Sequence, residues 1–310
     1  MITTNPIIVT TSMVSDSSVP YPDTGETAWN SGTNYAAGAT ASYQIDGVYH
    51  RFESKQGGNL NHIPVAYPDD KTNAWWIDLG YVNRLAVFQL DRNTQTITAS
   101  PYTVAVNSGQ RVGAIGIGNI EADSVKLEVF TASAELVSAQ TKSLLLRDVY
   151  DWYSWTYAPF YQIRSTLFTN LPLNSGYTFK LTFLRSSGNV AVGAIVAGMP
   201  QDIGRALMGG VGVRKLNFST FERDEFGEVK ITKRRNIPKV NFQLRIDRTK
   251  LNGVGRLIDD LNGVVTFWAG IENSQHSYFE NTFVIGMYKD FGNLIDQPDY
   301  VQADIEIEAI

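Results

Sequence analysis

The chain has 310 residues, of which 43% are hydrophobic and 18% charged, with 26 glycines, 11 prolines and no cysteine. This composition excludes wholesale disorder, disulfide bonds, thiolate catalysis and cysteine-ligated zinc. The net charge of −5 argues against a general binder of polyanions. We expect two or three compact units at this length, and the 12% of aromatic residues favours β structure over helix.

The beginning of the chain does not resemble a targeting segment. Its first residues, MITTNPIIVTTSMVSDSS, have no basic stretch and only a short apolar run. No apolar run in the chain approaches the roughly 18 residues that a membrane helix needs. We therefore expect a protein made in a cytosol and not inserted into a membrane.

Residues 1–80 are expected to form an N-terminal arm followed by a small β module rich in aromatic residues. A loose entrance at 10–25 precedes an aromatic-dense block that begins at Trp29 and ends at Trp76. Asp46-Gly47 stands between two tyrosine-bearing segments, and this dipeptide is a strong hairpin-turn signal.

The aromatic block has a characteristic order of residues. It reads Ala28-Trp29, Tyr35-Ala-Ala-Gly38, Asp46-Gly47-Val48-Tyr49, Asn61-His62-Ile63-Pro64 and Ala74-Trp75-Trp76. This order resembles the chitin- and cellulose-binding modules of carbohydrate-binding families 5 and 12. Their outline is a Trp, a Tyr followed by Gly, a G-x-x-Y strand, an N-x-x-P loop and a closing Trp pair. The resemblance implies a candidate sugar site at Trp75 and Trp76, with Tyr49 and Tyr35 as neighbours.

Strand geometry separates the two tryptophans. Successive side chains of a strand point to opposite faces, so Trp75 and Trp76 cannot both fill the core, and we expect Trp75 to point outward. A sugar that covers roughly 100 Å² of an indole gains about 2.5 kcal/mol, most of which association entropy offsets. Such a site is useful only on a multivalent particle. The alternative, that a neighbouring domain or subunit covers the outward ring, stays open.

Residues 81–204 are expected to form a β-sandwich of the jelly-roll type. Apolar and polar residues alternate in SVKLEVF (124–130) and TFKLTFL (178–184), while 190–198 is apolar on both faces, as an interior strand requires. Between these strands, the stretch from Asp148 to Tyr157 mixes carboxylates with aromatic rings. It is interpreted either as a loop packed over the sandwich or as one inserted into a partner.

Residues 205–310 are expected to form a third, β-rich assembly domain with one short helix. Gly209-Gly210-Val-Gly212 is predicted to be a flexible connector, and Val254–Leu261 has helical periodicity. The alternation of Val240, Phe242, Leu244 and Ile246 predicts a strand. A last strand is predicted at 304–308.

Charge is segregated along the chain. Residues 1–80 carry 3 basic and 8 acidic side chains, residues 205–250 carry 12 basic and 5 acidic ones, and residues 290–310 carry 6 acidic and none basic. The pattern fits copies that meet through opposite charges, and it equally fits domains with unrelated surfaces. Weak aromatic interleaving makes nucleic acid an unfavoured partner of the basic stretch. The candidate assembly contacts are Lys230, Lys233, Arg234, Arg235, Asp304 and Glu306.

The residues give little sign of catalysis. The histidines His50, His62 and His276 lack metal-ligand spacing, and no G-x-S-x-G motif is present. The closest carboxylate pairs are Asp69-Asp70, Asp259-Asp260 and Asp148/Asp151, which we interpret as surface charges of loops and a helix. No catalytic residue, metal or cofactor is predicted.

A second resemblance extends over most of the chain. DLGYVNRLAVF (78–88), NTQTI (93–97), VIGMYKDF (284–291) and IEIEAI (305–310) resemble, by their arrangement, virion proteins of tailed bacteriophages. The resemblance implies a non-enzymatic structural protein of the tail, baseplate or fibre-attachment region, assembled in the host cytoplasm into the virion. Its partners would be other virion proteins and further copies of itself. The alternatives are a cell-surface glycan-binding adhesion module and, less favoured, a glycan-degrading enzyme.

Overall fold

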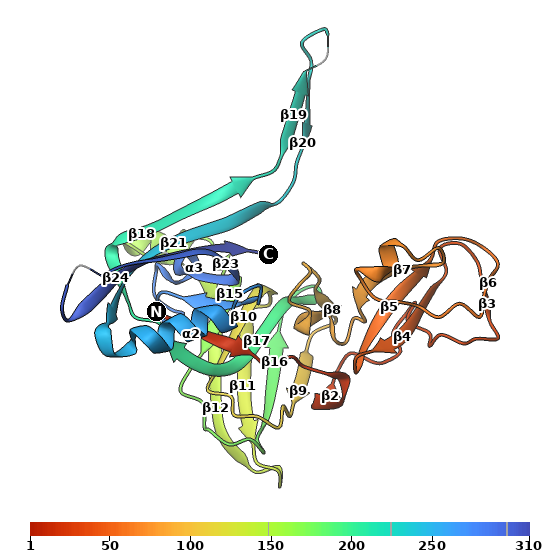
Figure 1. Ribbon diagram of the computed structural model, residues 1–310, viewed down its shortest axis with the longest axis horizontal. Helices are drawn as coiled ribbons and strands as arrows, with labels where there is room; N and C mark the ends of the chain where they lie inside the picture. The colour runs from red at the N-terminus through yellow and green to blue at the C-terminus, as the bar shows by residue number, and fades with distance from the viewer. Residues whose placement is uncertain (148, 224, 296) are drawn as a thin grey trace. The chain divides into compact units, whose positions relative to one another are not determined.

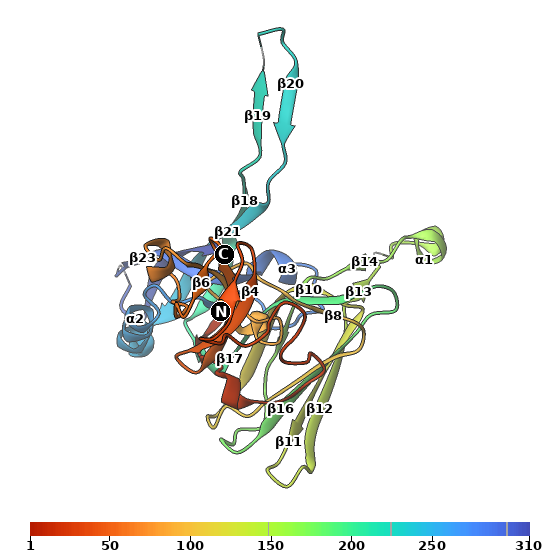
Figure 2. The same ribbon diagram turned by 90° about the vertical axis from the view of Figure 1, so that its right-hand side faces the viewer.

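The computed structural model describes residues 1–147, 149–223, 225–295 and 297–310, without the side chains of Asp70 and Met208. The protein is mostly β, with 50% of residues in strands and 10% in helices, as the composition predicts. The chain divides into two compact units, one of residues 7–198 and one of residues 1–6 with 199–310. Figures 1 and 2 show their elements from two sides.

This division into two units differs from the three consecutive parts, 1–80, 81–204 and 205–310, that the sequence suggested. Residues 7–80 and 81–198 share one unit, because Val48 of the aromatic module packs into the same hydrophobic cluster as Val104 and Leu127. The first strand belongs with the C-terminal residues, because Ile2 pairs with Ala269. Strand pairing between such distant segments leaves no local signal in the sequence.

The aromatic module of the first-described unit (7–198) is built on a small antiparallel sheet. The strand order of this sheet is β4-β5-β7. Strands β3 and β6 pair with each other in a separate two-stranded sheet. Asp46 and Gly47 both have positive φ, as the tight turn between β4 and β5 requires, which confirms the predicted hairpin. The bounds are β3 Asn34–Tyr35, β4 Thr40–Ile45, β5 Val48–Ser54, β6 Asn59–Leu60 and β7 Trp76–Tyr81.

Two further sheets of this unit enclose a common core. One has the order β12-β11-β16-β9-β2, and the other contains β15-β10-β17 with β8 beside β17. The predicted alternation is confirmed, since Val125, Leu127 and Val129 are all buried. The bounds are β2 Val14–Ser17, β8 Thr96–Thr98, β9 Tyr102–Val106, β10 Ala114–Glu121, β11 Ser124–Phe130, β12 Leu136–Ser143, β13 Leu145–Leu146, α1 Trp152–Tyr157, β14 Tyr161–Gln162, β15 Ser165–Phe168, β16 Thr178–Leu184 and β17 Val190–Asp202.

The second unit (1–6 and 199–310) contains one sheet whose strands run β1-β22-β23-β24-β21-β18. Buried residues of β21 and β24 pack with α2, whose span confirms the helix predicted at 254–261. The bounds are β1 Ile2–Pro6, β18 Arg205–Asn217, β19 Thr220–Arg223, β20 Val229–Thr232, β21 Asn236–Asp247, α2 Leu251–Asp260, β22 Thr266–Ala269, α3 Phe279–Thr282, β23 Phe283–Leu294 and β24 Tyr300–Ala309.

The glycine-rich stretch predicted to be a connector is part of strand β18 instead. A Cβ at Gly210 would lie 2.3 Å from Oε1 of Gln243 on β21. The glycine therefore serves close packing between two strands rather than a hinge.

Two glycines of β23 give a matched test of this sheet. A Cβ at Gly286 would lie 2.0 Å from the Glu308 carbonyl oxygen of β24, whereas a Cβ at Gly292 would contact nothing within 4 Å. Gly286→Ala should lower the free energy of unfolding by about 2–3 kcal/mol, because the strands must separate to admit the methyl group. Gly292→Ala should change it by less than about 0.5 kcal/mol. Urea denaturation measures both, and equal effects would contradict the strand register.

Candidate interaction surfaces

Strands β18 and β21 continue beyond the core of their unit. Their pairing runs from Arg205–Arg245 to Asn217–Asn236, and β19 pairs with β20 further along the same hairpin. The core side of β21 is buried from Val240 onward, whereas every described residue of β19 and β20 is exposed. Figures 1 and 2 show this hairpin extending away from the sheet of its unit. We call residues 220–232 the ribbon.

The ribbon has one apolar and one polar face. Phe221 lies opposite Ile231, and Val229 lies two residues from Ile231, so their side chains share one face. Their exposed fractions are 64%, 71% and 48%. The opposite face carries Thr220, Glu222, Lys230 and Thr232. An isolated two-stranded hairpin is marginally stable in water, so this apolar face is a candidate contact surface.

Arg223 also lies on the apolar face of the ribbon. It lies opposite Val229, and its guanidinium carbon stands 5.8 Å from the centre of the Phe221 ring. The face therefore combines aliphatic and aromatic groups with one cation, a composition that is common at the energetic centres of protein interfaces.

The predicted basic contacts cluster at the ribbon and its base. Lys230 lies in β20, and Lys233, Arg234 and Arg235 follow it, all of them exposed. The Arg234 amide donates to the Ser219 hydroxyl at 3.0 Å, which ties the two sides of the hairpin together below the ribbon. These cations are thus placed together, as their sequence proximity suggests.

The predicted acidic contacts lie on β24. Asp304 is exposed, opposite Gln243 of β21, whereas Glu306 forms an ion pair of 2.7 Å with Lys239 of its own chain. Glu306 is therefore already engaged within the chain. Asp296, within the acidic segment 290–310, lies outside the described residues.

The stretch predicted to be a loop over the sandwich or an insertion into a partner is a second exposed apolar surface. Residues 149–161, which we call the aromatic finger, include α1 and the first residue of β14. Asp151 caps α1 by accepting from the Ser154 amide, which lowers the pKa of its carboxyl group. Arg147 stands 5.0 Å from the centre of the Phe160 ring. The most exposed rings are Tyr150 (86%), Trp152 (79%), Tyr153 (73%), Tyr157 (69%), Phe160 (64%) and Trp155 (54%).

Two of the predicted sugar-binding rings fill the core of the aromatic module. Trp76 is completely buried, and its indole N–H donates to the His62 carbonyl oxygen at 2.8 Å. Tyr35 is also buried, edge-on to Trp76 at 5.1 Å, and its hydroxyl accepts from the Asn30 amide. Neither ring offers a face to a sugar, because both complete the interior of a very small sheet.

The other two rings lie apart from each other. Trp75 is half-buried and stacks on the His62 imidazole with 3.8 Å between ring centres, so at least part of the indole stays accessible. Tyr49 instead contacts Tyr21 in a tilted arrangement, with 4.4 Å between ring centres, and packs on the core cluster of the sandwich. Of the four predicted sugar-binding residues, Trp75 is partly exposed at the surface of the module, with His62 stacked on one face of its indole.

A buried carboxylate, not recognised from the sequence, organises the same module. Asp78 accepts from the Tyr67 and Gly80 amides at 3.0 and 2.8 Å and contacts His50 and Arg92 at 3.3 Å. Burial raises the pKa of this carboxyl group, but the hydrogen bonds outweigh burial and hold the pKa below its usual value. A pocket of about 260 Å³ adjoins the cluster. His50, Asp78 and Arg92 are distant in sequence, so no motif signals them.

The predicted carboxylate pairs lie on surfaces. Asp259 and Asp260 are exposed on α2, and Asp69 is exposed beside Asp70, whose side chain is not described. Asp148, the predicted neighbour of Asp151, lies outside the described residues. Among the side chains that are described, no group of three His, Asp or Glu residues has the geometry of a metal site. None of the described helices combines the length and apolarity needed to cross a bilayer.

Comparison with known proteins identifies no relative. No protein-family model, no curated protein and no solved structure matches this chain.

The ribbon's apolar face is a candidate contact surface that was not predicted from the sequence. The charged residues of 221–235 are the stronger pattern there, but Val229 and Ile231 alternate with polar residues. That alternation is the signal that could have predicted an amphipathic strand pair.

Replacement of Asp78 tests the organisation of the aromatic module. Asp78→Asn should lower the free energy of unfolding by about 2–4 kcal/mol at pH 7, since an amide cannot accept from all these donors. The wild-type carboxylate has a lowered pKa in the folded state, so its contribution is present above about pH 4 and is lost as the pH falls through that pKa. The difference between the proteins should therefore shrink in acid.

Denaturant titrations between neutral and acidic pH measure this difference. Asp91→Asn, at an exposed aspartate beside the same pocket, is the control and should leave stability within about 0.5 kcal/mol of wild type. A loss for Asp78→Asn that stays constant with pH would refute the role given to its charge.

Proposed function

We propose that this chain is a non-enzymatic structural component of a tailed-bacteriophage virion, in the tail, baseplate or fibre-attachment region, and that it works through protein–protein assembly. The observation that carries the proposal is the ribbon, whose apolar face has no covering element among the described residues of its own unit. The aromatic finger adds a second such surface.

The ribbon's chemistry suits a stable contact. Full burial of a large apolar side chain contributes about 1.5–3 kcal/mol, so Phe221, Val229 and Ile231 together supply several kcal/mol once a partner covers them. The surrounding cations Lys230, Lys233 and Arg234 would accelerate encounter with an acidic partner more than they would strengthen the final complex.

In this proposal the three predicted parts have separate tasks. The aromatic module (1–80) is displayed or used as a docking knob. The jelly-roll-like sandwich (81–204) forms the body, and the basic third part (205–310) contacts other virion proteins and further copies of the chain.

The ribbon gives the first test. A triple variant, Phe221→Thr, Val229→Thr and Ile231→Thr, keeps strand propensity but removes the apolar face. We expect it to fold with wild-type stability and to be lost from assembled particles, which quantitative mass spectrometry of purified virions measures. The matched control, Thr220→Ser with Thr232→Ser, changes the polar face and should assemble normally. Absence of the wild-type protein from virions would refute the proposal, as would normal incorporation of the triple variant.

A second candidate function is weak glycan binding by the aromatic module. The observation that favours it is the half-buried Trp75, stacked on His62 at the surface of a module that resembles sugar-binding modules. An aromatic face of this kind supports binding only at about millimolar strength, so adhesion would require many copies on one particle.

Chitin retention and a glycan array test this second function. Trp75→Ala should abolish retention, because the stacking face is removed, whereas Trp152→Ala in the aromatic finger should retain it. Trp152 is a suitable control because it is exposed and lies outside the module. Equal behaviour of wild type and Trp75→Ala would exclude the Trp75 site.

A further inference from the structure

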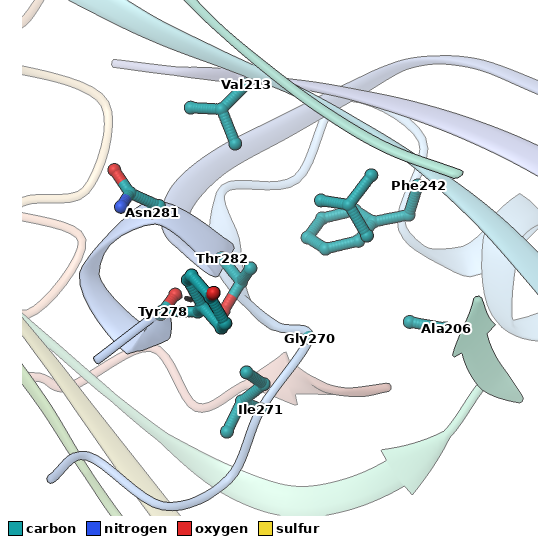
Figure 3. A pocket seen from close by; sticks show the side chains of 9 residues that line it. Ala206, Val213, Phe242, Gly270, Ile271, Tyr278, Asn281 and Thr282 are labelled. Atoms are coloured by element: carbon teal, nitrogen blue, oxygen red, sulfur yellow. Dashed lines mark hydrogen bonds between the residues drawn. The ribbon is translucent and has the colours of Figure 1, made fainter. Parts of the chain in front are cut away.

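The second unit contains an apolar pocket at the base of the hairpin. It has a volume of about 540 Å³ and is lined by Ala206, Val211 and Val213 of β18, Phe242 of β21, and Gly270, Ile271, Tyr278, Asn281 and Thr282. Figure 3 shows Phe242 on one side of the space and Tyr278 and Ile271 on another, with Val213 and Asn281 near its margin. This volume is within the roughly 300–1,000 Å³ typical of binding pockets, so an aromatic side chain has room in it.

The pocket lies where the pairing of β18 with β21 is irregular. Ala206 pairs with Leu244, and the next pair is Val211 with Phe242. Between these two pairs β18 advances by five residues, whereas β21 advances by only two. This irregularity displaces β18 from the sheet just where Phe242 faces the interior. β18 is the last strand of the sheet among the described residues, so no described strand of this sheet lies beyond it.

The ribbon of the same chain does not reach this pocket. Phe221 lies eight residues beyond Val213 along an extended hairpin, which corresponds to roughly 26 Å at the usual rise of a strand. Figures 1 and 2 both show the hairpin continuing away from the sheet rather than folding back on it. The exposed apolar face of the ribbon and the apolar pocket described here therefore lie too far apart along the hairpin to meet within one chain.

The one charged side chain on the ribbon's apolar face is opposite in sign to the carboxylates beside the pocket, although the described ribbon as a whole carries three acidic side chains (Glu222, Glu225 and Glu228) and two basic ones (Arg223 and Lys230). Arg223 lies on the ribbon's apolar face, while Glu272 follows Ile271 and Glu280 precedes Asn281 at the pocket, both exposed. Arg205 and Arg214 adjoin lining residues of β18 in sequence, but the alternation of a strand directs them to its other face.

We infer that the ribbon of one copy inserts its apolar face, Phe221 with Ile231, into this pocket of a second copy. The inference rests on the proposed function and names the partner as another molecule of the same chain. Because projection and pocket are different surfaces, the contact is head-to-tail, and its repetition closes a ring or extends a filament.

Cross-linking tests this contact directly, because the chain contains no cysteine. Phe221→Cys and Val213→Cys are made as separate proteins, mixed and oxidised. We expect a disulfide-linked heterodimer on a non-reducing gel, formed several-fold faster than with the control pair Thr220→Cys and Val213→Cys. Thr220 is adjacent to Phe221 but on the polar face. All three positions are exposed, so the folded state should tolerate the changes.

The other outcomes distinguish the inference from the proposed function. Equal rates for the two mixtures would overturn the inference, as would preferential linkage of Phe221→Cys to itself, which would indicate that ribbons pack on ribbons. If the triple threonine variant were nevertheless lost from virions, the ribbon's partner would be a different virion protein and the proposed function would stand.

Discussion

The strand pair β18–β21 is longer than the hydrophobic core beneath it. On β21 the alternating residues from Val240 to Ile246 are buried against α2 and the neighbouring strands. Beyond Val240 the same hairpin continues, and its apolar residues have no opposing layer among the described residues of the unit. A sheet that extends past its own core leaves an amphipathic surface whose stability depends on what it meets.

In the proposed assembly contact, hydrophobic burial contributes more to stability than ion pairs do. The charge segregation seen in the sequence suggests copies joined by opposite charges, yet Glu306 is held by Lys239 within one chain. Exposed ion pairs contribute little to stability, whereas burial of a phenylalanine or isoleucine contributes a few kcal/mol. The cations around the ribbon are therefore suited to steering a partner, and the apolar face to holding it.

Local patterns in the sequence predicted much of the fold. The Asp46-Gly47 turn, the alternating sandwich strands and the helix near Val254 each depend on residues close together in the chain, and each is present. The pairing of Ile2 with Ala269 and the Asp78 cluster join distant segments and had no such signal.

The candidate sites were predictable only in part. Trp75 is more exposed than the buried Trp76, as expected, although Trp75 lies just before β7 rather than in it; the sequence could not place Tyr35 inside the module or Tyr49 against the sandwich. Glycines at 209–212 suggested flexibility, because the close approach of Gly210 to Gln243 of β21 is visible only in three dimensions. For the ribbon, charged residues beside Phe221 masked a period of two that was present in the sequence.

Hydrogen–deuterium exchange of the ribbon amides, compared between dilute protein and assembled particles, shows whether a partner covers the ribbon's apolar face. If the apolar face is completed by a partner, amides of residues 220–232 exchange fastest among the strands in dilute protein and become strongly protected on assembly. Protection that is already complete in the dilute monomer, or exchange that stays fast in the assembled particle, would contradict the account.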